Sequence, residues 1–214
     1  MAPVAGKPFL HYQMQYWARQ GIEHFILSVG YKGQLIRDYF GDSFQGVRVT
    51  YAVEKELAGT GGGIIKASRE LITDKPFLVL NGDTYCDAEL GGVIEHHQSR
   101  KADITMVVLE MPVADRYGIV ELNDNGDLKG FHSPRQGSET GGLINTGIYL
   151  MNPAVVAEFV QKEGGKTSLE SDIFPVILGS HTISAYQTKS HFIDIGIPED
   201  YARCETIITG ASID

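Results

Sequence analysis

Apolar runs rich in β-branched and aromatic residues alternate with segments of helical periodicity through the first half of the chain. Strands are predicted at residues 24–29, 47–53, 77–81 and 104–110, and helices at 31–40, 62–71 and 88–99. Strands that are apolar on both faces need cover on both sides, and intervening helices supply it. The pattern therefore predicts an α/β fold, a three-layer sandwich with a mostly parallel, doubly wound sheet of the Rossmann-like kind.

The regular alternation of predicted strands and helices ends after Pro112. Short strands are predicted at 118–122 and 127–131, on either side of Asn123-Asp124-Asn125-Gly126, and Asn-Gly between apolar runs is a strong hairpin signal. A strand at 142–151, a helix at 153–161, a strand at 182–187 and a helix at 198–208 follow. Pro198 suits the first turn of that last helix. We expect one domain over residues 1–214.

Composition limits the classes of partner. The formal charge of −9 opposes binding to nucleic acid or to an anionic membrane surface. The apolar runs are shorter than the ~20 residues that a membrane-spanning helix needs. No basic segment followed by an apolar stretch marks a secretory signal. Cys86 and Cys204 are expected to be reduced thiols, as in a cytoplasmic protein.

A glycine-rich turn, Gly59-Thr60-Gly61-Gly62-Gly63, follows one predicted strand and opens the next helix. Glycines let a ligand approach the backbone, and a helix start offers free N–H groups. The spacing fits neither the dinucleotide fingerprint nor the P-loop. From these residues alone, a ligand-binding turn and a plain connecting turn are equally good interpretations.

Two aspartates are candidates for a metal site. Asp83 comes just after the strand at 77–81, where ligands bind in open α/β sheets, and Asp194 follows another short apolar stretch. A pair of carboxylates bridging to phosphates is a usual way to hold Mg²⁺, although either aspartate alone is better read as a cap or turn residue. Asp87 is expected to cap the following helix, and His96-His97 to lie on a solvated helix face.

Several of these motifs resemble those of the sugar-phosphate nucleotidyltransferases (NDP-sugar pyrophosphorylases), especially the guanylyltransferases acting on D-glycero-α-D-manno-heptose 1-phosphate or mannose 1-phosphate. The similarity lies in Glu-x-x-Leu-x-Gly-Thr-Gly-Gly, Asn-Gly-Asp and Asp-Ile-Gly-Ile-Pro-Glu-Asp-Tyr. It implies that Asp83 and Asp194 are catalytic residues that bind Mg²⁺. It also implies nucleotide-binding roles for a larger set, which comprises Glu54, Gly59, Thr60, Gly61, Asn81 and Gly82.

The resemblance extends to the sugar side. Tyr-Gly-Ile-Val and Asn-Thr-Gly-Ile-Tyr are similar to family motifs that face the sugar phosphate, although read alone they are plain strands with a bulge. The resemblance assigns Tyr117, Gly118, Asn145 and Gly147 to the sugar. Where many members have Glu-Lys-Pro, this chain has His-Ser-Pro-Arg, so Arg135 is the candidate to replace the lysine. The implied halves are residues 1–111 for the nucleotide and 112–214 for the sugar.

The resemblance begins inside a motif. Residues 1–8 are similar to the tail of the family signature, whose head carries the first, central strand and a phosphate-cradling Gly-Gly-x-Gly-Thr-Arg-Leu loop. A fragment or an internal start methionine competes here with a natural shortened form. A central strand pairs on both sides, so we expect a rearranged sheet, or a partner strand or homo-oligomer that fills the missing position. Lys7 is expected at the start of the following helix.

The resemblance implies transfer of a nucleotidyl group from a nucleoside triphosphate, GTP by preference, to a heptose or mannose 1-phosphate. The products are an NDP-sugar and pyrophosphate, made in the cytoplasm for lipopolysaccharide or capsule, with no nucleic acid or membrane as partner. The alternative is a catalytically silent nucleotide-binding or regulatory subunit of the same fold. A glycosyltransferase ranks third, because Asp83 and Asp87 do not form the Asp-x-Asp motif of that class.

Overall fold

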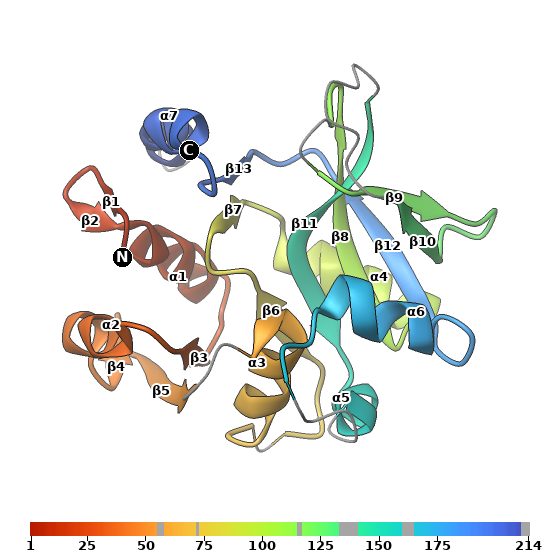
Figure 1. The fold of residues 1–214 in the computed structure, drawn as a ribbon, viewed down its shortest axis with the longest axis horizontal. Helices are drawn as coiled ribbons and strands as arrows, with labels where there is room; N and C mark the ends of the chain where they lie inside the picture. The colour runs from red at the N-terminus through yellow and green to blue at the C-terminus, as the bar shows by residue number, and fades with distance from the viewer. Residues whose placement is uncertain (55–57, 72, 115–116, 133–140, 160–164, 211–214) are drawn as a thin grey trace.

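A computed structural model describes residues 1–54, 58–71, 73–114, 117–132, 141–159 and 165–210. Its centre is a six-stranded sheet with helices on both faces (Figure 1). The long strand β11 (Gly142–Met151) runs antiparallel to β6 (Phe77–Leu80) on one side and to β8 (Ile104–Met111) on the other. Strand β12 (Ile183–Thr188) then pairs in parallel with β8. The sheet is mixed, but β6, β8 and β12 all point the same way.

The hairpin of β9 (Ile119–Leu122) and β10 (Leu128–His132) extends this sheet beyond β11. It confirms the hairpin predicted from Asn-Gly. The Asn123 side-chain oxygen accepts from the backbone N–H groups of Asn125 and Asp127, and Gly126 turns the chain at a φ of +81°. An Asn side chain that bonds its own backbone two residues on is the usual device of such turns.

Alternate residues of the central strands face two different cores, which confirms the predicted three layers. On β11, Tyr149 and Met151 pack with α5 (Pro153–Phe159) and α6 (Phe174–Ile177). Ile148 and Leu150 pack on the other face, with α1 (Phe9–Arg19) and α4 (Leu90–Arg100). This period of two follows from the strand pleat, so one strand serves both cores.

A separate three-stranded sheet holds β3 (His24–Val29), β5 (Val47–Val53) and β4 (Ser43–Phe44), next to α2 (Gly33–Phe40). Strand β3 is at one edge of this sheet, and β6 is at the edge of the larger one. Within the described ranges no strand pairs with both of them. The described strands thus form separate sheets without the family's usual first strand, which leaves the predicted partner strand or homo-oligomer untested. All of β6 is only half-buried, whereas β8 is buried over its first five residues.

Most predicted elements are confirmed with shifts of one or two residues at their ends. The helix α3 (Gly59–Ser68) begins three residues before its predicted start at residue 62, because the glycine turn itself is helical. Lys7 lies in β2 (Lys7–Pro8), paired with β1 (Pro3–Val4), so its expected place in a helix was wrong. The predicted end of the helix at 153–161 falls outside the described residues. Several elements were not predicted: β7 (Thr84–Cys86), β13 (Phe192–Asp194) and the π-helix η2 (Leu169–Ile173).

Two expectations about α4 were also wrong. Asp87 does not cap this helix: its carboxylate accepts from the backbone N–H of His191 at 2.6 Å, while Gln20 Oε1 caps Leu90 N at 2.6 Å. His97 is not solvated but buried, with ring nitrogens 2.9 Å from Thr105 Oγ1 and 3.2 Å from Asn152 Oδ1. A long-range partner such as Gln20 leaves no local sequence pattern, so the prediction chose the nearest acidic residue.

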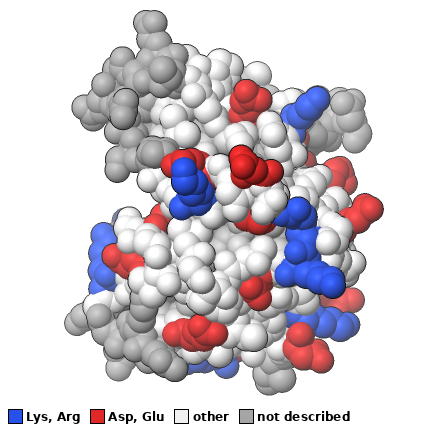
Figure 2. All heavy atoms as spheres, turned by 90° about the vertical axis from the view of Figure 1, so that its right-hand side faces the viewer, with Lys and Arg blue, Asp and Glu red and all other residues white. Residues whose placement is uncertain are grey.

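Cys86 and Cys204 are free and buried, as expected, and burial raises the pKa of Cys86 to about 12. Among the described residues, no helix has the length and apolar character to cross a bilayer. The face over the β9–β10 hairpin and β12 carries both acidic and basic side chains, and several basic side chains adjoin one another at its right (Figure 2).

Candidate active site

Residues 81–83 form the turn between β6 and β7, and this turn carries Asp83. The buried side chain of Gln13, on α1, donates to the carbonyl oxygens of Asn81 and Thr84, both at 2.7 Å. The carbonyl of Asp83 itself accepts from Ile195 N at 3.0 Å. The turn is therefore held on both sides of Asp83. Gly82 is exposed and has open space around it, so this side of the turn is accessible.

Asp194 is brought to the same place by the antiparallel pair β7–β13, in which it lies opposite Thr84. Gly196 N donates to Asp194 Oδ1 at 2.6 Å, and a Cβ on Gly196 would lie 2.8 Å from that oxygen. The surrounding protein, and then the negative charge of Asp194, raise the pKa of the Asp83 carboxyl. The structure thus unites two like charges, an arrangement that a hard divalent cation with oxygen ligands stabilises.

The glycine turn starts beside a third carboxylate. Glu54 accepts from Ser28 Oγ at 2.6 Å through Oε1 and from Ala58 N at 3.1 Å through Oε2. Gly63 faces the same side chain, because a Cβ there would lie 3.1 Å from Glu54 Oε1. Each carboxylate oxygen has two lone pairs, so Glu54 keeps acceptor capacity for a ligand.

Residues 167–173, which we call the back wall, pack against the glycine turn. The Thr167 carbonyl accepts from the N–H groups of Gly61 and Gly62 at 2.9 and 3.4 Å, and Thr167 N donates to Ala58 O at 2.8 Å. Of the first four N–H groups of α3, those of Gly59 and Thr60 bond to no described residue. Gly61, predicted to bind nucleotide, has therefore committed its own N–H within the protein.

The glycines of the turn are required by this packing. Gly59 has a φ of +76°, and a Cβ on it would lie 2.5 Å from the Thr167 carbonyl oxygen. A Cβ on Gly61 would lie 2.5 Å from Ile173 Cδ1. The back wall was missed in the sequence, where its one local signal is Ser168, whose Oγ accepts from Ser171 N as a helix cap does.

In the segment predicted to bind the sugar, β11 carries a bulge between Asn145 and Tyr149. Asn145 Oδ1 accepts from Gly147 N at 2.9 Å, and the Gly147 carbonyl accepts from Asn81 N at 2.9 Å. Gly147 has a φ of +77°, and a Cβ on it would lie 2.6 Å from Asn81 Nδ2. The predicted sugar motif therefore touches the turn that holds Asp83.

Tyr117 brings the β9–β10 hairpin to the same region. Its ring meets the ring of Phe192 edge to face, with 5.6 Å between centroids, and Phe192 is two residues from Asp194. Gly118 follows directly and immediately precedes β9. Arg135 lies outside the described residues.

Comparison with known proteins decides the family, because residues 1–210 match the nucleotidyl transferase family over nearly the whole chain. The chain belongs to the nucleotidyl transferase family. It is 37% identical over 209 residues to a D-glycero-α-D-manno-heptose 1-phosphate guanylyltransferase of Aneurinibacillus thermoaerophilus, covering 96% of this chain and 86% of that protein. It is 33% identical to a mannose-1-phosphate guanylyltransferase of Mycobacterium tuberculosis, covering 95% of this chain and 56% of the relative.

A solved member of similar structure is HddC from Yersinia pseudotuberculosis complexed with GMP-PN. It superposes with a TM-score of 0.84 and 32% identity, over 96% of this chain and 88% of that one. This nucleotidyl transferase chain therefore shares the fold of a solved structure that is complexed with GMP-PN.

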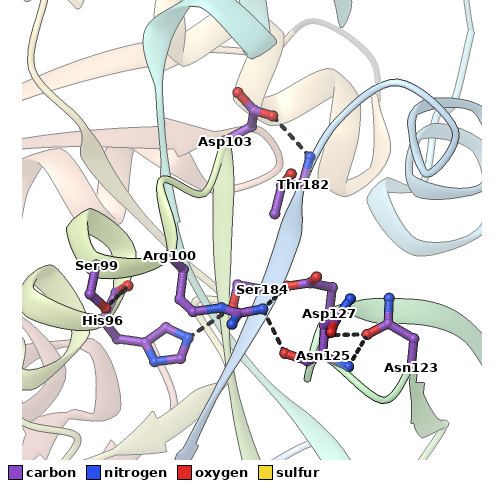
Figure 3. A network of polar contacts seen from close by, with 9 residues as sticks. All are labelled: His96, Ser99, Arg100, Asp103, Asn123, Asn125, Asp127, Thr182 and Ser184. Carbon is purple, nitrogen blue, oxygen red and sulfur yellow. Dashed lines mark hydrogen bonds and ion pairs between the residues drawn. The ribbon is translucent and has the colours of Figure 1, made fainter.

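The turn of the β9–β10 hairpin is anchored by side chains of α4 (Figure 3). Arg100 Nη2 donates to Asn125 O at 2.5 Å and to Asp127 Oδ1 at 2.9 Å. The ring of His96 lies 2.9 Å from the buried Ser184 Oγ of β12, which corrects its expected solvated place. Helix α4 thus fixes the hairpin turn to the central sheet.

Proposed function

We propose that this chain transfers a guanylyl group from GTP to a heptose or mannose 1-phosphate, forming a GDP-sugar and pyrophosphate. The observation that carries the proposal is the Asp83–Asp194 pair, placed by β7 and β13 beside the bulge at Gly147. The names of the relatives supply the substrate class. They are names of catalysts, which favours the enzyme over the silent nucleotide-binding subunit.

The reaction needs no nucleophile from the protein. An oxygen of the sugar 1-phosphate attacks the α-phosphorus of GTP, and the bond from that phosphorus to the bridging oxygen breaks, releasing pyrophosphate. Asp83 and Asp194 would hold Mg²⁺, which when bound offsets the charge of the two phosphates. Gln13 fixes the backbone on both sides of Asp83, and Gly196 N fixes one oxygen of Asp194, so this chain's own contribution is positioning.

The choice of base would fall to Glu54 and the glycine turn. The guanine edge presents two donors, N1–H and the 2-amino group, next to the O6 acceptor. Glu54 would accept from the donors, and the N–H groups of Gly59 and Thr60, which bond to no described residue, would serve O6. Adenine presents an acceptor at N1, which a carboxylate repels, so ATP would be a poor substrate. Asn81, Gly82 and Gly61 would complete this nucleotide side, within residues 1–111.

The sugar 1-phosphate would lie in the half formed by residues 112–214. Gly118 and Gly147 would allow it to approach the strands closely, and Tyr117 and Asn145 would border it. Arg135 is proposed to pair with its phosphate, in place of the lysine that many members have.

Strands β3 and β6 each pair with only one strand among the described residues, and this supports a further proposal about assembly. An extended segment, from a partner or from a second copy of this chain, would pair between them and cover the half-buried side chains of β6. Analytical ultracentrifugation tests it, since a strictly monomeric protein that buries no further segment would contradict it.

The expected setting is the cytoplasm, with the product used for lipopolysaccharide or capsule.

A coupled assay of pyrophosphate release tests the activity, with GTP, Mg²⁺ and D-glycero-α-D-manno-heptose 1-phosphate or mannose 1-phosphate. Asp83→Asn and Asp194→Asn should each abolish release, and ATP should support little of it. Glu95→Gln, an exposed carboxylate on α4, is the matched control and should behave as wild type. Nucleotide binding without release from either sugar would instead support the silent subunit.

A further inference from the structure

Glu170, in the back wall, lies between the glycine turn and β11. Its Oε1 accepts from Tyr149 OH at 2.8 Å. Its Oε2 accepts from Ser168 Oγ at 3.1 Å and from Thr60 Oγ1 at 3.4 Å. One carboxylate therefore receives hydroxyl groups from β11, from its own segment and from the proposed base-binding turn.

The same contacts continue along β11 toward the sugar side. Tyr149 OH accepts from Asn145 Nδ2 at 2.5 Å, and Asn145 Oδ1 accepts from Gly147 N at 2.9 Å. An unbroken series of hydrogen bonds thus runs from the bulge at Gly147, through Asn145, Tyr149 and Glu170, to Thr60. We call this series the Glu170 bridge. It joins the two proposed substrate sites without passing through Asp83 or Asp194.

The chemistry of the bridge requires a carboxylate at its centre. Tyr149 is fully buried, and burial together with the charge of Glu170 holds the pKa of its hydroxyl well above the usual value, so the hydroxyl stays protonated. Because that hydroxyl already accepts from Asn145, its proton must go to Glu170. Glu170 accepts hydroxyl groups through both of its carboxylate oxygens. A glutamine has one acceptor oxygen, so its N–H₂ group would face either the Tyr149 hydroxyl or those of Ser168 and Thr60.

Thr60 is also held by the main chain of the back wall. Its Oγ1 accepts from Leu169 N at 2.8 Å while it donates to Glu170. Both bonds fix the side chain of Thr60, whose N–H bonds to no described residue. These contacts connect the β11 bulge on one side with the first turn of α3 on the other.

We propose that Glu170 is a positioning residue that couples the binding of the two substrates, so that the sugar 1-phosphate tightens the binding of the nucleotide and the reverse. The proposal rests on the proposed function, because it uses that function's two substrate sites. Coupling of this kind is reciprocal, and a typical value is a factor of about 5 to 150 in affinity.

Calorimetry on the full chain with Mg²⁺ directly measures the coupling factor, which is the change in nucleotide affinity caused by the sugar 1-phosphate. The nucleotide is the α,β-methylene analogue of GTP, whose α–β bond does not cleave, titrated with and without saturating heptose 1-phosphate. In wild type the sugar should tighten nucleotide binding at least about fivefold. Glu170→Gln and Tyr149→Phe should bring the factor close to one, while Glu95→Gln keeps the wild-type value.

Thermal melts and steady-state kinetics separate coupling from a loss of structure. Glu170→Gln should lower the melting temperature modestly, keep the wild-type kcat and keep the nucleotide affinity measured without sugar, while the KM for GTP at saturating sugar rises toward its value at low sugar. A wild type that binds no nucleotide contradicts the proposed function. A wild type that binds both ligands independently, or a Glu170→Gln variant with the wild-type coupling factor, overturns the role of Glu170 alone.

Discussion

Two glycines border the candidate site, Gly59 in the glycine turn and Gly147 in the bulge of β11, and they differ in what excludes a side chain there. Gly59 and Gly147 have nearly the same backbone angle, with φ of +76° and +77°. A Cβ on Gly59 would strike the carbonyl oxygen of Thr167 at 2.5 Å, whereas a Cβ on Gly147 would strike the side chain of Asn81 at 2.6 Å. The first obstacle is main chain and cannot rotate away. The comparison indicates that Gly59 is confined by a neighbouring backbone, whereas Gly147 is confined by a neighbouring side chain whose amide group can rotate although its Cβ, at 2.9 Å, cannot.

The largest effect is expected for Gly59→Ala. A left-handed angle costs a non-glycine residue about 1–2 kcal/mol, and overpacking adds about 1–3 kcal/mol. The turn would have to part from Thr167, so GTP binding should be lost even where the protein still folds. Urea unfolding gives the stability and calorimetry gives the affinity.

Thr167→Gly is the informative partner for that variant. It removes the side chain but leaves the carbonyl oxygen, so it should not rescue Gly59→Ala. Recovery of GTP binding in the double variant would show that the obstacle is not the backbone.

Gly147→Ala should cost less in total, because the obstacle beyond the shared left-handed angle is the Asn81 side chain. Displacement of Asn81 would disturb the turn that carries Asp83, so kcat should fall more than GTP affinity. Combination with Asn81→Ala should recover part of the lost stability, measured as the interaction term of a double-mutant cycle. If the stability effects of Gly147→Ala and Asn81→Ala are strictly additive, the Asn81 side chain is not the obstacle at Gly147, and the difference between Gly59 and Gly147 disappears.

Gln13→Leu tests the hold on the same turn from the opposite side. The change leaves the carbonyl groups of Asn81 and Thr84 without their donor, and an unsatisfied buried acceptor costs about 1–3 kcal/mol. Asp83 should lose its fixed position, so a higher Mg²⁺ concentration should be needed for half-maximal activity. An unchanged Mg²⁺ requirement at lowered stability would assign Gln13 to folding alone.

The sequence predicted the parts of this site that are local. Apolar strands ending in Asn-Gly-Asp, the Asn-Gly hairpin and the Pro198 helix start depend on neighbouring residues, and the structure has each of them. The long-range partners were not predictable, because Gln13, Thr167 and Glu170 act on residues about 70 to 110 positions away. His97 shows the same limit, since Asn152, 55 residues distant, makes a polar position buried.

Arg100→Met tests the anchor of the β9–β10 hairpin, whose first strand begins two residues after Tyr117. Loss of the contacts to Asn125 and Asp127 should lower stability by no more than about 1 kcal/mol, because the pair is partly exposed. The KM for the sugar 1-phosphate should rise by less than about tenfold, with GTP affinity unchanged. A larger effect on GTP than on sugar would show that the two sides are not anchored separately. Lys101→Met, exposed at the next position, is the matched control.

The smallest effect is expected at His181, which belongs to neither the glycine turn nor the bulge of β11. Its ring lies 3.1 Å from Glu158 Oε2 and 3.4 Å from Asp103 Oδ2, and the hydrogen bond to Glu158 is the first cause that raises its pKa above 6.5. A raised pKa means that the folded state binds the proton more tightly than the unfolded chain. The stabilisation is therefore complete below pH 6.5 and is lost as the pH rises through the raised pKa. His181→Gln should lower the urea midpoint at about pH 5.5 and leave it nearly unchanged at about pH 8.5, with both substrate affinities as in wild type. A difference that does not vary with pH would mean that the ring stabilises this corner by packing, without its charge.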